Sequence, residues 1–208
     1  DLNDQTPVYQ AADADDAISV AENSGTGSID AGTITDTDTG NTFGCTLGGA
    51  DAADFACTIS GSTVNVAFAA DPDYDNPADA DTNNVYVVTV LINDGAANDA
   101  NGATTLTITV TDYNDETPTY SSSDSSPSIT EGVTAVETVA ITDTDSLDTN
   151  ACIMGGVDAD DFTCSISPTQ FVLAFATSPD YDSPSDSDQN NIYTVTITVN
   201  DGTQSGST

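Results

Sequence analysis

The chain of 208 residues contains 35 aspartate and glutamate residues and no lysine, arginine or histidine, so its formal net charge is −35. This composition excludes binding to the phosphate backbone of a nucleic acid, which depends on Lys and Arg, and catalysis by a histidine base, a lysine nucleophile or an arginine clamp. Because 37% of the residues are apolar, the chain is also not an unfolded acidic tail, and its length suits two domains of about 100 residues.

The unopposed negative charge repels itself in a compact state, so high salt or divalent cations must offset it. Two compatible interpretations follow: an acidic surface that keeps a marine or halophilic secreted protein soluble, and a set of cation sites. The sequence has no run of about 18 apolar residues, so we expect no membrane span in this segment. Its first residues show no signal peptide and start within a motif, so we expect an interior segment of a longer protein.

An internal repeat organises the chain. The segment ITDTDTG at 34–40 recurs as ITDTDSL at 141–147, and PDYDNPADADTNNVYVVTVLINDG at 72–95 recurs as PDYDSPSDSDQNNIYTVTITVNDG at 179–202. Both pairs are offset by 107 residues (34 to 141, 72 to 179), whereas the openings TPVY and TPTY are offset by 111 (Tyr9 to Tyr120). We therefore predict two tandem domains, 1–111 with a linker motif at 1–7 and 112–208 with a linker motif at 112–118.

Acidic motifs at matching positions open each repeat. A D-x-N-D linker motif comes first, a single Glu follows, and a D-x-D motif lies in the ITDTD segment. In the first repeat these residues are Asp1, Asn3, Asp4, Glu22, Asp36 and Asp38, and in the second they are Asp112, Asn114, Asp115, Glu131, Asp143 and Asp145. A random acidic surface would not place the same clusters in register twice.

Two pairs of cysteines come next, Cys45 with Cys57 and Cys152 with Cys164, and each pair flanks an acidic loop, GGADAADF or GGVDADDF. This arrangement predicts that the paired cysteines lie on adjacent antiparallel strands, where a disulfide closes the hairpin. The alternative, a zinc site, needs four neighbouring ligands, and the chain has no His. We predict one structural disulfide in each repeat, as is typical of a secreted protein.

Further acids follow the cysteines. The PDYD motif contributes Asp73 and Asp75, with Asp180 and Asp182 in the second repeat, and the NDG motif contributes Asp94 and Asp201. Many hard oxygen ligands without His or thiolate favour Ca²⁺ over zinc or copper, and Ca²⁺ takes about six to eight oxygens, so carboxylates from several strand ends must converge.

A polar run between these motifs, DADTNN in the first repeat and DSDQNN in the second, has two interpretations. It is either a further Ca²⁺ site or, as the favoured alternative, a solvated turn that such side chains close unaided. The residues concerned are Asp79, Asp81 and Asn83, and Asp186, Asp188 and Asn190.

Strict alternation of apolar and polar residues indicates half-buried antiparallel strands, and no helical period of useful length occurs. TLTITVT at 105–111 places Leu106, Ile108 and Val110 on one face, and YTVTITV at 193–199 does the same with Tyr193, Val195, Ile197 and Val199. Each repeat is predicted to be an all-β sandwich of about seven short strands, the second lacking its last strand. Either the chain is cut before that strand, or a neighbouring chain supplies it by strand addition.

These motifs resemble those of cadherin repeats over nearly the whole chain. DYNDETP at 112–118 resembles the D-x-N-D-N-x-P linker of that family, VAEN at 20–23 its early Glu motif, ITDTDTG its D-x-D motif, and PDYDNPADADTNNVYVVTV its segment leading into the penultimate strand. GGADAADF, PDYDNP and NDG are similar to segments of bacterial cadherin-like repeats in large surface adhesins and biofilm proteins. Two positions depart from the family: Glu116 replaces the second linker Asn, where a backbone carbonyl is used, and Asp75 replaces a Glu, which shortens that ligand.

The resemblance implies two tandem cadherin-like Greek-key sandwiches with Ca²⁺ between successive domains. The junction would take its ligands from the first repeat, the linker and the second repeat: Glu22, Asp73 and Asp75; Asp112, Asn114, Asp115 and the Glu116 carbonyl; and Asp143, Asp145 and Asp201. Two half-junctions would remain: Asp1, Asn3, Asp4, Asp36, Asp38 and Asp94 at the start of the chain, and Glu131, Asp180 and Asp182 toward its end.

These features predict a calcium-binding extracellular module, a structural segment of a cell-surface adhesin or secreted filament that Ca²⁺ makes rigid at domain junctions. Its expected partners are neighbouring repeats of the same array and, through strand addition, other copies. The alternative is a recognition module for a glycan or a partner cadherin-like domain, although the chain has no Trp. Paired carboxylates can also hydrolyse glycosides, but their repeat-matched positions favour metal sites, so we expect no enzyme.

Overall fold

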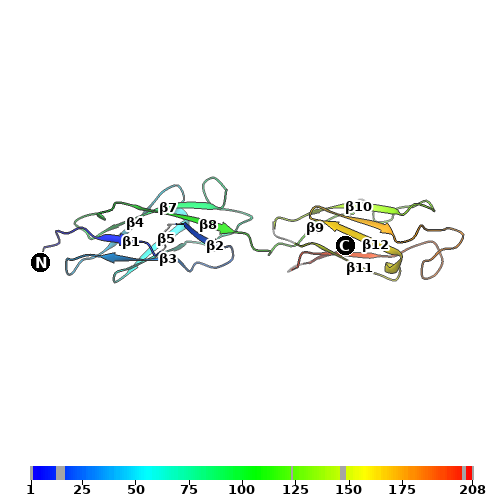
Figure 1. Cartoon of the computed structure of the whole chain (residues 1–208), viewed down its shortest axis with the longest axis horizontal. Helices are drawn as coiled ribbons and strands as arrows, with labels where there is room; N and C mark the ends of the chain where they lie inside the picture. Colours follow the sequence, from blue (N-terminus) through cyan, green and yellow to red (C-terminus); the bar gives the residue numbers. More distant parts are fainter. Residues whose placement is uncertain (1, 13–16, 123, 146–148, 203–204, 208) are drawn as a thin grey trace. The chain divides into compact units, whose positions relative to one another are not determined.

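The computed structural model describes residues 2–12, 17–122, 124–145, 149–202 and 205–207. The chain forms two compact units, Asp1–Tyr113 and Asn114–Thr208, which are called repeat 1 and repeat 2 below. The regular secondary structure described in each unit is β-strand except for one short 3₁₀ turn (Figure 1). No helix among the described residues is long and apolar enough to cross a membrane.

Repeat 1 is a sandwich of two four-stranded sheets. One sheet has the order β1 (Val8–Gln10), β3 (Ser28–Thr35), β6 (Thr63–Phe68) and β5 (Phe55–Ser60), and the other has the order β2 (Ala17–Ala21), β8 (Thr104–Thr111), β7 (Val85–Asn93) and β4 (Gly44–Gly48). A short 3₁₀ turn, η1 (Ala52–Asp54), precedes β5. Neighbouring strands are antiparallel except β2 and β8, which run parallel with Ala17 opposite Thr107.

The opening strand of repeat 1 is divided between the two sheets, so the described part of this repeat has eight strands where about seven were predicted. β1 pairs with β3 in one sheet, and β2 pairs with β8 in the other. Strands that change sheets in this way form the corners of β-sandwiches. The parallel pairing brings Glu22, the residue after β2, to the end of β8, where its N–H donates to the Thr111 carbonyl at 3.1 Å.

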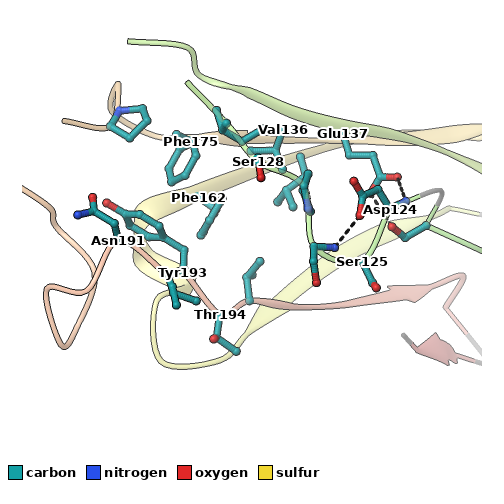
Figure 2. Close-up of a pocket in the computed structure, with 18 of the residues that line it drawn as sticks. Asp124, Ser125, Ser128, Val136, Glu137, Phe162, Phe175, Asn191, Tyr193 and Thr194 are labelled. Atoms are coloured by element: carbon teal, nitrogen blue, oxygen red, sulfur yellow. Dashed lines mark hydrogen bonds between the residues drawn. The ribbon is translucent and has the colours of Figure 1, made fainter. Parts of the chain in front are cut away.

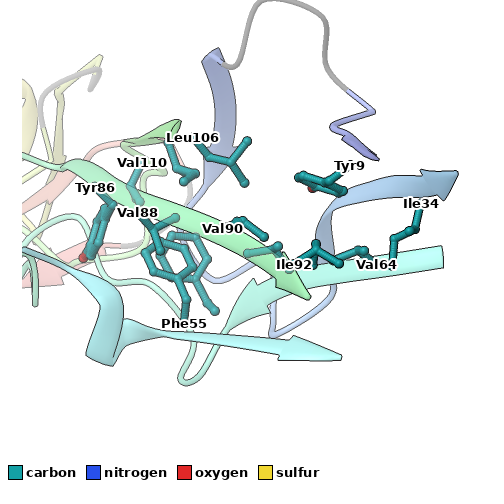
Figure 3. Packing of buried hydrophobic residues seen from close by; sticks show 13 residues of the cluster. Tyr9, Ile34, Phe55, Val64, Tyr86, Val88, Val90, Ile92, Leu106 and Val110 are labelled. Carbon is teal, nitrogen blue, oxygen red and sulfur yellow. The ribbon is translucent and has the colours of Figure 1, made fainter. Parts of the chain in front are cut away.

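The predicted alternation of β8 is confirmed, and its apolar face fills the centre of repeat 1. Leu106, Ile108 and Val110 are at most 1% exposed and share one core with side chains from both sheets: Tyr9, Ile34, Phe55, Val64, Val66, Phe68, Tyr86, Val88, Val90 and Ile92 (Figure 3). Full burial of an aliphatic side chain stabilises a fold by about 1.5–3 kcal/mol, so β8 contributes several kcal/mol to the sandwich.

Repeat 2 has the same strand order in a less complete form. One sheet consists of β12 (Phe162–Ser167), β13 (Gln170–Phe175), β10 (Ala135–Thr142) and β9 (Thr119–Tyr120), and the other of β11 (Ala151–Gly155), β14 (Thr196–Asn200) and β15 (Ser205–Ser207). The turn η2 (Ala159–Asp161) precedes β12 as η1 precedes β5. The aromatic cluster is also repeated, because Phe162 stacks on Phe175 with ring centroids 4.6 Å apart, as Phe55 stacks on Phe68 at 4.7 Å.

The end of repeat 2 holds one additional short strand and differs from the sequence-based expectations in one respect. After Gly202, whose φ is +111°, the strand β15 pairs antiparallel with Thr198–Asn200 of β14, and by the 107-residue offset it corresponds to residues 98–100 of repeat 1 and not to β8. The expected strand at 193–199 is shorter, since β14 begins at Thr196 and residues 192–195 belong to no strand. Ile197 and Val199 are buried as predicted, whereas Tyr193 and Val195 are only half-buried.

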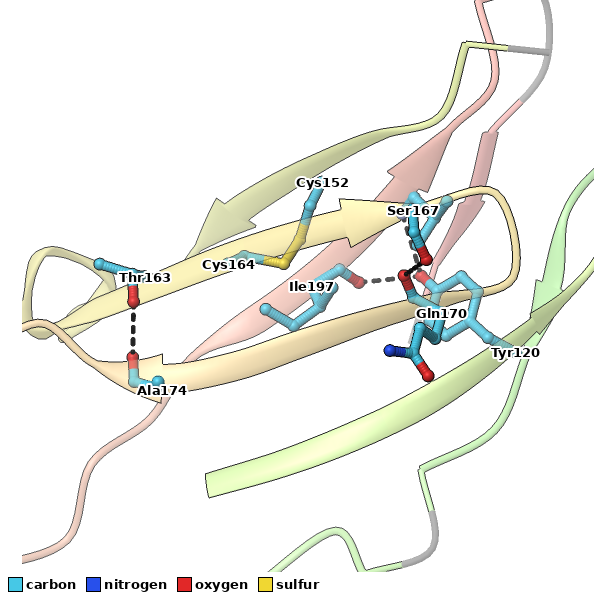
Figure 4. The surroundings of a disulfide bond; sticks show 9 residues. Tyr120, Cys152, Thr163, Cys164, Ser167, Gln170, Ala174 and Ile197 are labelled. Atoms are coloured by element: carbon cyan, nitrogen blue, oxygen red, sulfur yellow. Dashed lines mark hydrogen bonds between the residues drawn. A yellow bond between two sulfur atoms is a disulfide. The ribbon is translucent and has the colours of Figure 1, made fainter. Parts of the chain in front are cut away.

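Both predicted disulfides are formed, but neither closes a hairpin. Cys45–Cys57 joins β4 to β5, and Cys152–Cys164 joins β11 to β12 (Figure 4). The two strands of each pair belong to different sheets, because the acidic loop with its 3₁₀ turn carries the chain from one sheet to the other. Each disulfide therefore holds the two sheets of its sandwich together along one edge.

Removal of the first disulfide by the paired substitutions Cys45→Ala and Cys57→Ala is expected to lower the free energy of unfolding of repeat 1. The chain-entropy relation gives a loss of about 3 kcal/mol for a loop of this length. Urea denaturation followed by circular dichroism measures the loss. The pair Cys152→Ala and Cys164→Ala closes a loop of the same 12-residue separation, so a comparable loss in repeat 2 is expected. Unfolding unchanged in both repeats would contradict a stabilising role.

Candidate metal sites

The N-terminal cluster of repeat 1 comprises Asn3, Asp4, Asp36, Asp38 and Asp94; Asp1, which was assigned to the same site, lies outside the described residues. The Asn3 side-chain amide donates to the Asp94 carbonyl at 3.0 Å. The N–H groups of Asp4 and Gln5 donate to one carboxylate oxygen of Asp38 at 2.9 and 2.8 Å, and the Asp38 N–H donates to Asp36. The linker, D-x-D and NDG motifs therefore meet at one end of repeat 1.

Asp94 is the most enclosed member of this cluster, with only 3% of its surface exposed. Its Oδ1 accepts hydrogen bonds from the N–H groups of Ala97 and Ala96 at 2.7 and 2.8 Å, and these bonds hold the pKa of the Asp94 carboxyl below its ordinary value despite burial. Its Oδ2 is buried and accepts no hydrogen bond from any described residue. A buried anionic oxygen without a donor is unfavourable, and a bound cation would satisfy it.

The N-terminal cluster of repeat 2 comprises Asn114, Asp115, Glu116, Asp143, Asp145 and Asp201, and it repeats this arrangement. The Asn114 side-chain amide donates to the Asp201 carbonyl at 3.0 Å, and the Glu116 N–H donates to Asp145 at 2.9 Å. Asp145 and Asp201 are buried, and Asp143 Oδ2 is a buried oxygen that accepts no hydrogen bond from the described part of the chain.

The C-terminal cluster of repeat 1 comprises Glu22, Asp73, Asp75 and Asp112. Glu22 is 3% exposed, and its two carboxylate oxygens accept the N–H groups of Tyr74 at 2.6 Å and Tyr113 at 2.8 Å. One carboxylate oxygen of Glu22 lies within 4.8 Å of one of Asp75. Asp73 is exposed and accepts the Asn76 N–H at 2.9 Å, while Asp112 is half-buried. Glu22 therefore links the PDYD loop to the segment that follows β8.

The C-terminal cluster of repeat 2, Glu131, Asp180 and Asp182, is more open. Glu131 is exposed, and its carboxylate accepts the Tyr181 N–H at 3.2 Å. Asp180 accepts the Asp182 N–H at 3.0 Å, and both residues are exposed. Glu22 differs in that its carboxylate also accepts the N–H of Tyr113, two residues after the end of β8 at Thr111.

The polar run at Asp79–Asn83 closes its own turn. The two carboxylate oxygens of Asp79, a buried residue, accept the N–H groups of Asn83 at 2.9 Å and Asn84 at 3.3 Å. The Asn83 side chain donates to Asp81 at 2.8 Å and accepts the Val85 N–H at 2.7 Å. Asp186, Asp188 and Asn190 make the same four contacts. These bonds support the turn as the interpretation of the run.

Sequence reasoning missed Asp51 and Asp158, the first acids of the loops GGADAADF and GGVDADDF. Both are buried, and each crosslinks two distant segments through its two carboxylate oxygens. Asp51 accepts the N–H groups of Ala80 and Val87, and Asp158 accepts those of Ser187 and Thr194, all at 2.7–2.8 Å. Their matching positions in both repeats were a detectable signal, but their partners lie 29 and 36 residues away and could not be read from the sequence.

A pH dependence follows from Asp158. Hydrogen bonds from Thr194 and Ser187 lower the pKa of its carboxyl below the ordinary value of 3.8, so this carboxylate stabilises the fold above pH 3.8 and the contribution is lost as the pH falls through the folded-state pKa. Asp158→Asn is expected to lower the unfolding temperature at pH 7, and the difference from the wild type should shrink below pH 3.8. Thermal unfolding across this range is the measurement.

The matched control for this prediction is Asp160→Asn, which removes the same charge from an exposed position of η2. Its unfolding temperature should remain close to that of the wild type at both pH values. If Asp158→Asn and Asp160→Asn behave alike, the two N–H hydrogen bonds of Asp158 do not stabilise the loop.

The chemistry of the two N-terminal clusters and of the C-terminal cluster of repeat 1 fits Ca²⁺. Their ligand atoms are carboxylate and carbonyl oxygens, which Ca²⁺ prefers, and no cationic side chain exists in the chain to neutralise them. Each N-terminal cluster contains a buried carboxylate oxygen that accepts no hydrogen bond from the described residues, Asp94 Oδ2 in repeat 1 and Asp143 Oδ2 in repeat 2. A cation bound in each cluster would satisfy these oxygens.

Comparison with known proteins identifies the fold. No family model and no curated protein matches the chain. Among solved structures, the protocadherin gamma-B4 extracellular domain matches with a TM-score of 0.69 and 21% identity over 100% of this chain and 32% of that chain. Protocadherin gamma-B7 repeats EC3–6 match with a TM-score of 0.68 and 22% identity over 97% and 46%.

A third example is mouse cadherin-23 repeats EC22–24, with a TM-score of 0.66 and 19% identity over 98% of this chain and 65% of that chain. This chain spans about half the length, or less, of the first protocadherin chains that it matches. The likeness establishes an all-β fold of two tandem cadherin-like Greek-key sandwiches.

Proposed function

We propose that this chain, two tandem domains with the cadherin fold, is a calcium-binding extracellular module that serves as a structural segment of a surface adhesin or secreted filament. The supporting observation lies in the linker. The Tyr113 N–H is bound by Glu22 of repeat 1, and the side chain of the next residue, Asn114, is bound to the Asp201 carbonyl of repeat 2. Consecutive linker residues are thus anchored in acidic clusters of different repeats.

Calcium would supply the positive charge that these clusters lack and would accept about six to eight oxygens. The proposed ligands come from the C-terminal cluster of repeat 1, the linker and the N-terminal cluster of repeat 2: Glu22, Asp73, Asp75, Asp112, Asn114, Asp115, the Glu116 carbonyl, Asp143, Asp145 and Asp201. Without the cation these carboxylates repel one another, and the linker bends freely. With it, the same charges hold the linker to both repeats.

The N-terminal cluster of repeat 1 supports an array of such modules. The N-terminal cluster of repeat 1 already binds its own linker motif through Asp38 and Asp94, as the junction requires. Disulfides persist in oxidising compartments, so the two that are present support an extracellular location. The expected neighbours are further repeats of the same kind.

Isothermal titration of the chelator-treated protein with Ca²⁺ tests the proposal. Saturable binding of more than one Ca²⁺ per chain is expected, and the double variant Asp143→Asn and Asp145→Asn should lose part of the stoichiometry. The control Asp186→Asn, which alters the self-closed turn of repeat 2, should keep it. Absence of saturable heat, or identical stoichiometry in the double variant, would show that the proposed ligands do not bind calcium.

A further inference from the structure

Two strands of repeat 1 lie where they would oppose tension along the chain. β2 and β8 are parallel neighbours, with Ala17 opposite Thr107 and Ala21 opposite Thr111. β8 is the last strand of repeat 1 and leads into the linker, whereas β2 belongs to the opening of the repeat (Figure 1). A pull on both flanks of the repeat therefore draws β2 and β8 in opposite directions along their shared axis. Hydrogen bonds loaded in this way are sheared together, whereas those of a hairpin pulled at its open end break one after another.

The order of the sheet concentrates the load on this pair of strands. In the described sheet β2 is an edge strand that pairs with β8 alone, whereas β8 also pairs with β7 on its other side. The side chains of Leu106, Ile108 and Val110 fix β8 in the core, since each is at most 1% exposed. Ile18 and Val20 of β2 are only half-buried. Tension therefore separates β2 from β8 before it draws β8 out of the core.

Glu22 fastens the end of this strand pair that lies next to the linker. Its N–H donates to the Thr111 carbonyl at 3.1 Å, which extends the contact between the two strands by one bond. Its carboxylate oxygens accept the N–H groups of Tyr113 at 2.8 Å and Tyr74 at 2.6 Å. Because Glu22 is 3% exposed, these bonds lie in a region of low dielectric, where they are stronger than in water. A pull on the linker acts directly on the bond from Tyr113.

The segment before β2 is held by two further buried carboxylates. Asp99 accepts the Tyr9 N–H at 2.7 Å, and Asp30 accepts the Tyr9 hydroxyl and, at 2.7 Å, the Ala12 N–H. Asp30 belongs to β3, and Asp99 lies between β7 and β8. These bonds add to the pairing of β1 with β3, so the opening segment is anchored to both sheets of the sandwich.

The anchor at Asp30 has a counterpart in repeat 2. The 107-residue offset matches Asp30 to Glu137 (30 to 137). Glu137 accepts the Ser122 hydroxyl at 2.8 Å and the Asp124 N–H at 3.3 Å, so it holds the segment that follows β9 (Figure 2). In both repeats this carboxylate lies at a shift in strand register, where a β-bulge redirects a side chain. Anchoring of the opening segment is therefore common to both repeats.

We infer that repeat 1 resists tension through a shear clamp, which consists of the parallel pair β2–β8 and of Glu22 at its linker end. The anchors at Asp30 and Asp99 are released first, and β2 then shears from β8. This inference rests on the proposed function, because tension arises when neighbouring segments of an adhesin or filament pull on both flanks of the repeat. It gives Glu22 a second role beside calcium binding, since a carboxylate offers about four acceptor positions.

A shear clamp differs from ordinary stabilisation in its effect on rates. The rate of forced unfolding depends on the interactions that break before the transition state, and the remaining interactions do not change it. Asp51 is the matched comparison, because it is buried and its carboxylate accepts the N–H groups of Ala80 and Val87 at 2.8 and 2.7 Å. These bonds join the acidic loop to the polar run and to β7, and they do not connect β2 with β8. Asp51→Asn and Glu22→Gln should both lower the unfolding temperature, whereas only Glu22→Gln should weaken the repeat against force.

The test holds the 208-residue chain by its two ends in an optical trap, at constant force and in a chelating buffer. The unfolding event of repeat 1 is identified with the paired substitutions Cys45→Ala and Cys57→Ala. They lengthen that event by about 40 Å, because the disulfide no longer closes its 12-residue loop. At equal force Glu22→Gln is expected to unfold about tenfold or more faster than the wild type. Asp51→Asn should unfold within about twofold of the wild-type rate.

A second pair of variants leaves every buried side chain in place. Tyr113 is 55% exposed; Tyr113→Pro removes the N–H that Glu22 binds, and Tyr113→Ala keeps it. Tyr113→Pro should unfold about tenfold faster under force, and Tyr113→Ala should match the wild type. Equal rates for Glu22→Gln and Asp51→Asn, or for the two Tyr113 variants, would overturn the inference. The chelating buffer separates this result from the proposed function, whose failure would appear in the calcium titration and not in these rates.

Discussion

Millimolar Ca²⁺ is expected to raise the unfolding temperature of the chelator-treated protein by on the order of 10 °C. Binding to the folded state alone stabilises it by about 2.7 kcal/mol when the free ion is at about 100 times its Kd, and 1 kcal/mol shifts the midpoint of a domain of this size by about 4–8 °C. The effect should be large here because the buried oxygens of Asp94 and Asp143 gain a partner. Differential scanning calorimetry is the measurement.

Screening of the net charge must be separated from binding, because a chain with a formal charge of −35 is stabilised by any salt. Sodium chloride at matched ionic strength is therefore the first control, and Mg²⁺ is the second, since Mg²⁺ demands a more regular shell and keeps its water. The expected order of stabilisation is Ca²⁺, then Mg²⁺, then Na⁺. Equal shifts of the unfolding temperature with all three ions would mean that the salts act only by screening the net charge.

Glu22→Ala is expected to destabilise repeat 1 by about 3–6 kcal/mol in the absence of calcium, because two hydrogen bonds to a charged group are lost. The carboxylate is 3% exposed and binds the N–H groups of Tyr74 and Tyr113, and hydrogen bonds to charged groups contribute about 1.5–3 kcal/mol each. Its loss leaves two donors without their partner at the point where the PDYD loop meets the end of β8. Urea denaturation in a chelating buffer measures the change.

Glu131→Ala is the matched control, because Glu131 occupies the corresponding position of repeat 2 but is exposed and accepts one hydrogen bond at 3.2 Å. Surface substitutions of this kind change stability by about 0.5 kcal/mol or less. A Glu131 variant as unstable as the Glu22 variant would show that the two clusters are equally closed in solution.

The features that the sequence predicts well are those that depend on local pattern or on the repeat. The alternation of Leu106, Ile108 and Val110 predicts the buried face of β8, because a period of two needs no knowledge of the neighbours. The convergence of the linker with Asp38 and Asp94 was predicted from motif resemblance, and the hydrogen bonds within repeat 1 bring these residues together.

The features that the sequence predicts poorly depend on which sheet a strand joins. The spacing of Cys45 and Cys57 is equally suited to a hairpin and to a crossing between sheets, and only the pairing of β4 with β7 and of β5 with β6 distinguishes them. The alternation of residues 193–195 is also that of a strand, yet β14 begins only at Thr196. The alternation of apolar and polar residues shows that a segment can form a β-strand, and pairing with a neighbouring strand decides whether the β-strand forms.

The acidic residues divide into two groups with different roles. Asp51, Asp79, Asp158 and Asp186 are buried and accept backbone N–H groups with both carboxylate oxygens, so they close loops without a metal. Asp94 and Asp143 keep a buried oxygen that no described donor satisfies. High acidity alone therefore does not identify a ligand, and the unsatisfied oxygens are the better guide.

Small-angle X-ray scattering of the 208-residue chain, recorded in chelator and then in millimolar Ca²⁺, tests the proposed rigid junction most directly. Calcium is expected to increase the maximum dimension and to replace the scattering of two independently moving units with that of a single extended rod. The variant Asp143→Asn and Asp145→Asn should scatter in Ca²⁺ as the wild type does in chelator. Identical wild-type curves with and without Ca²⁺ would contradict a calcium-stiffened linker.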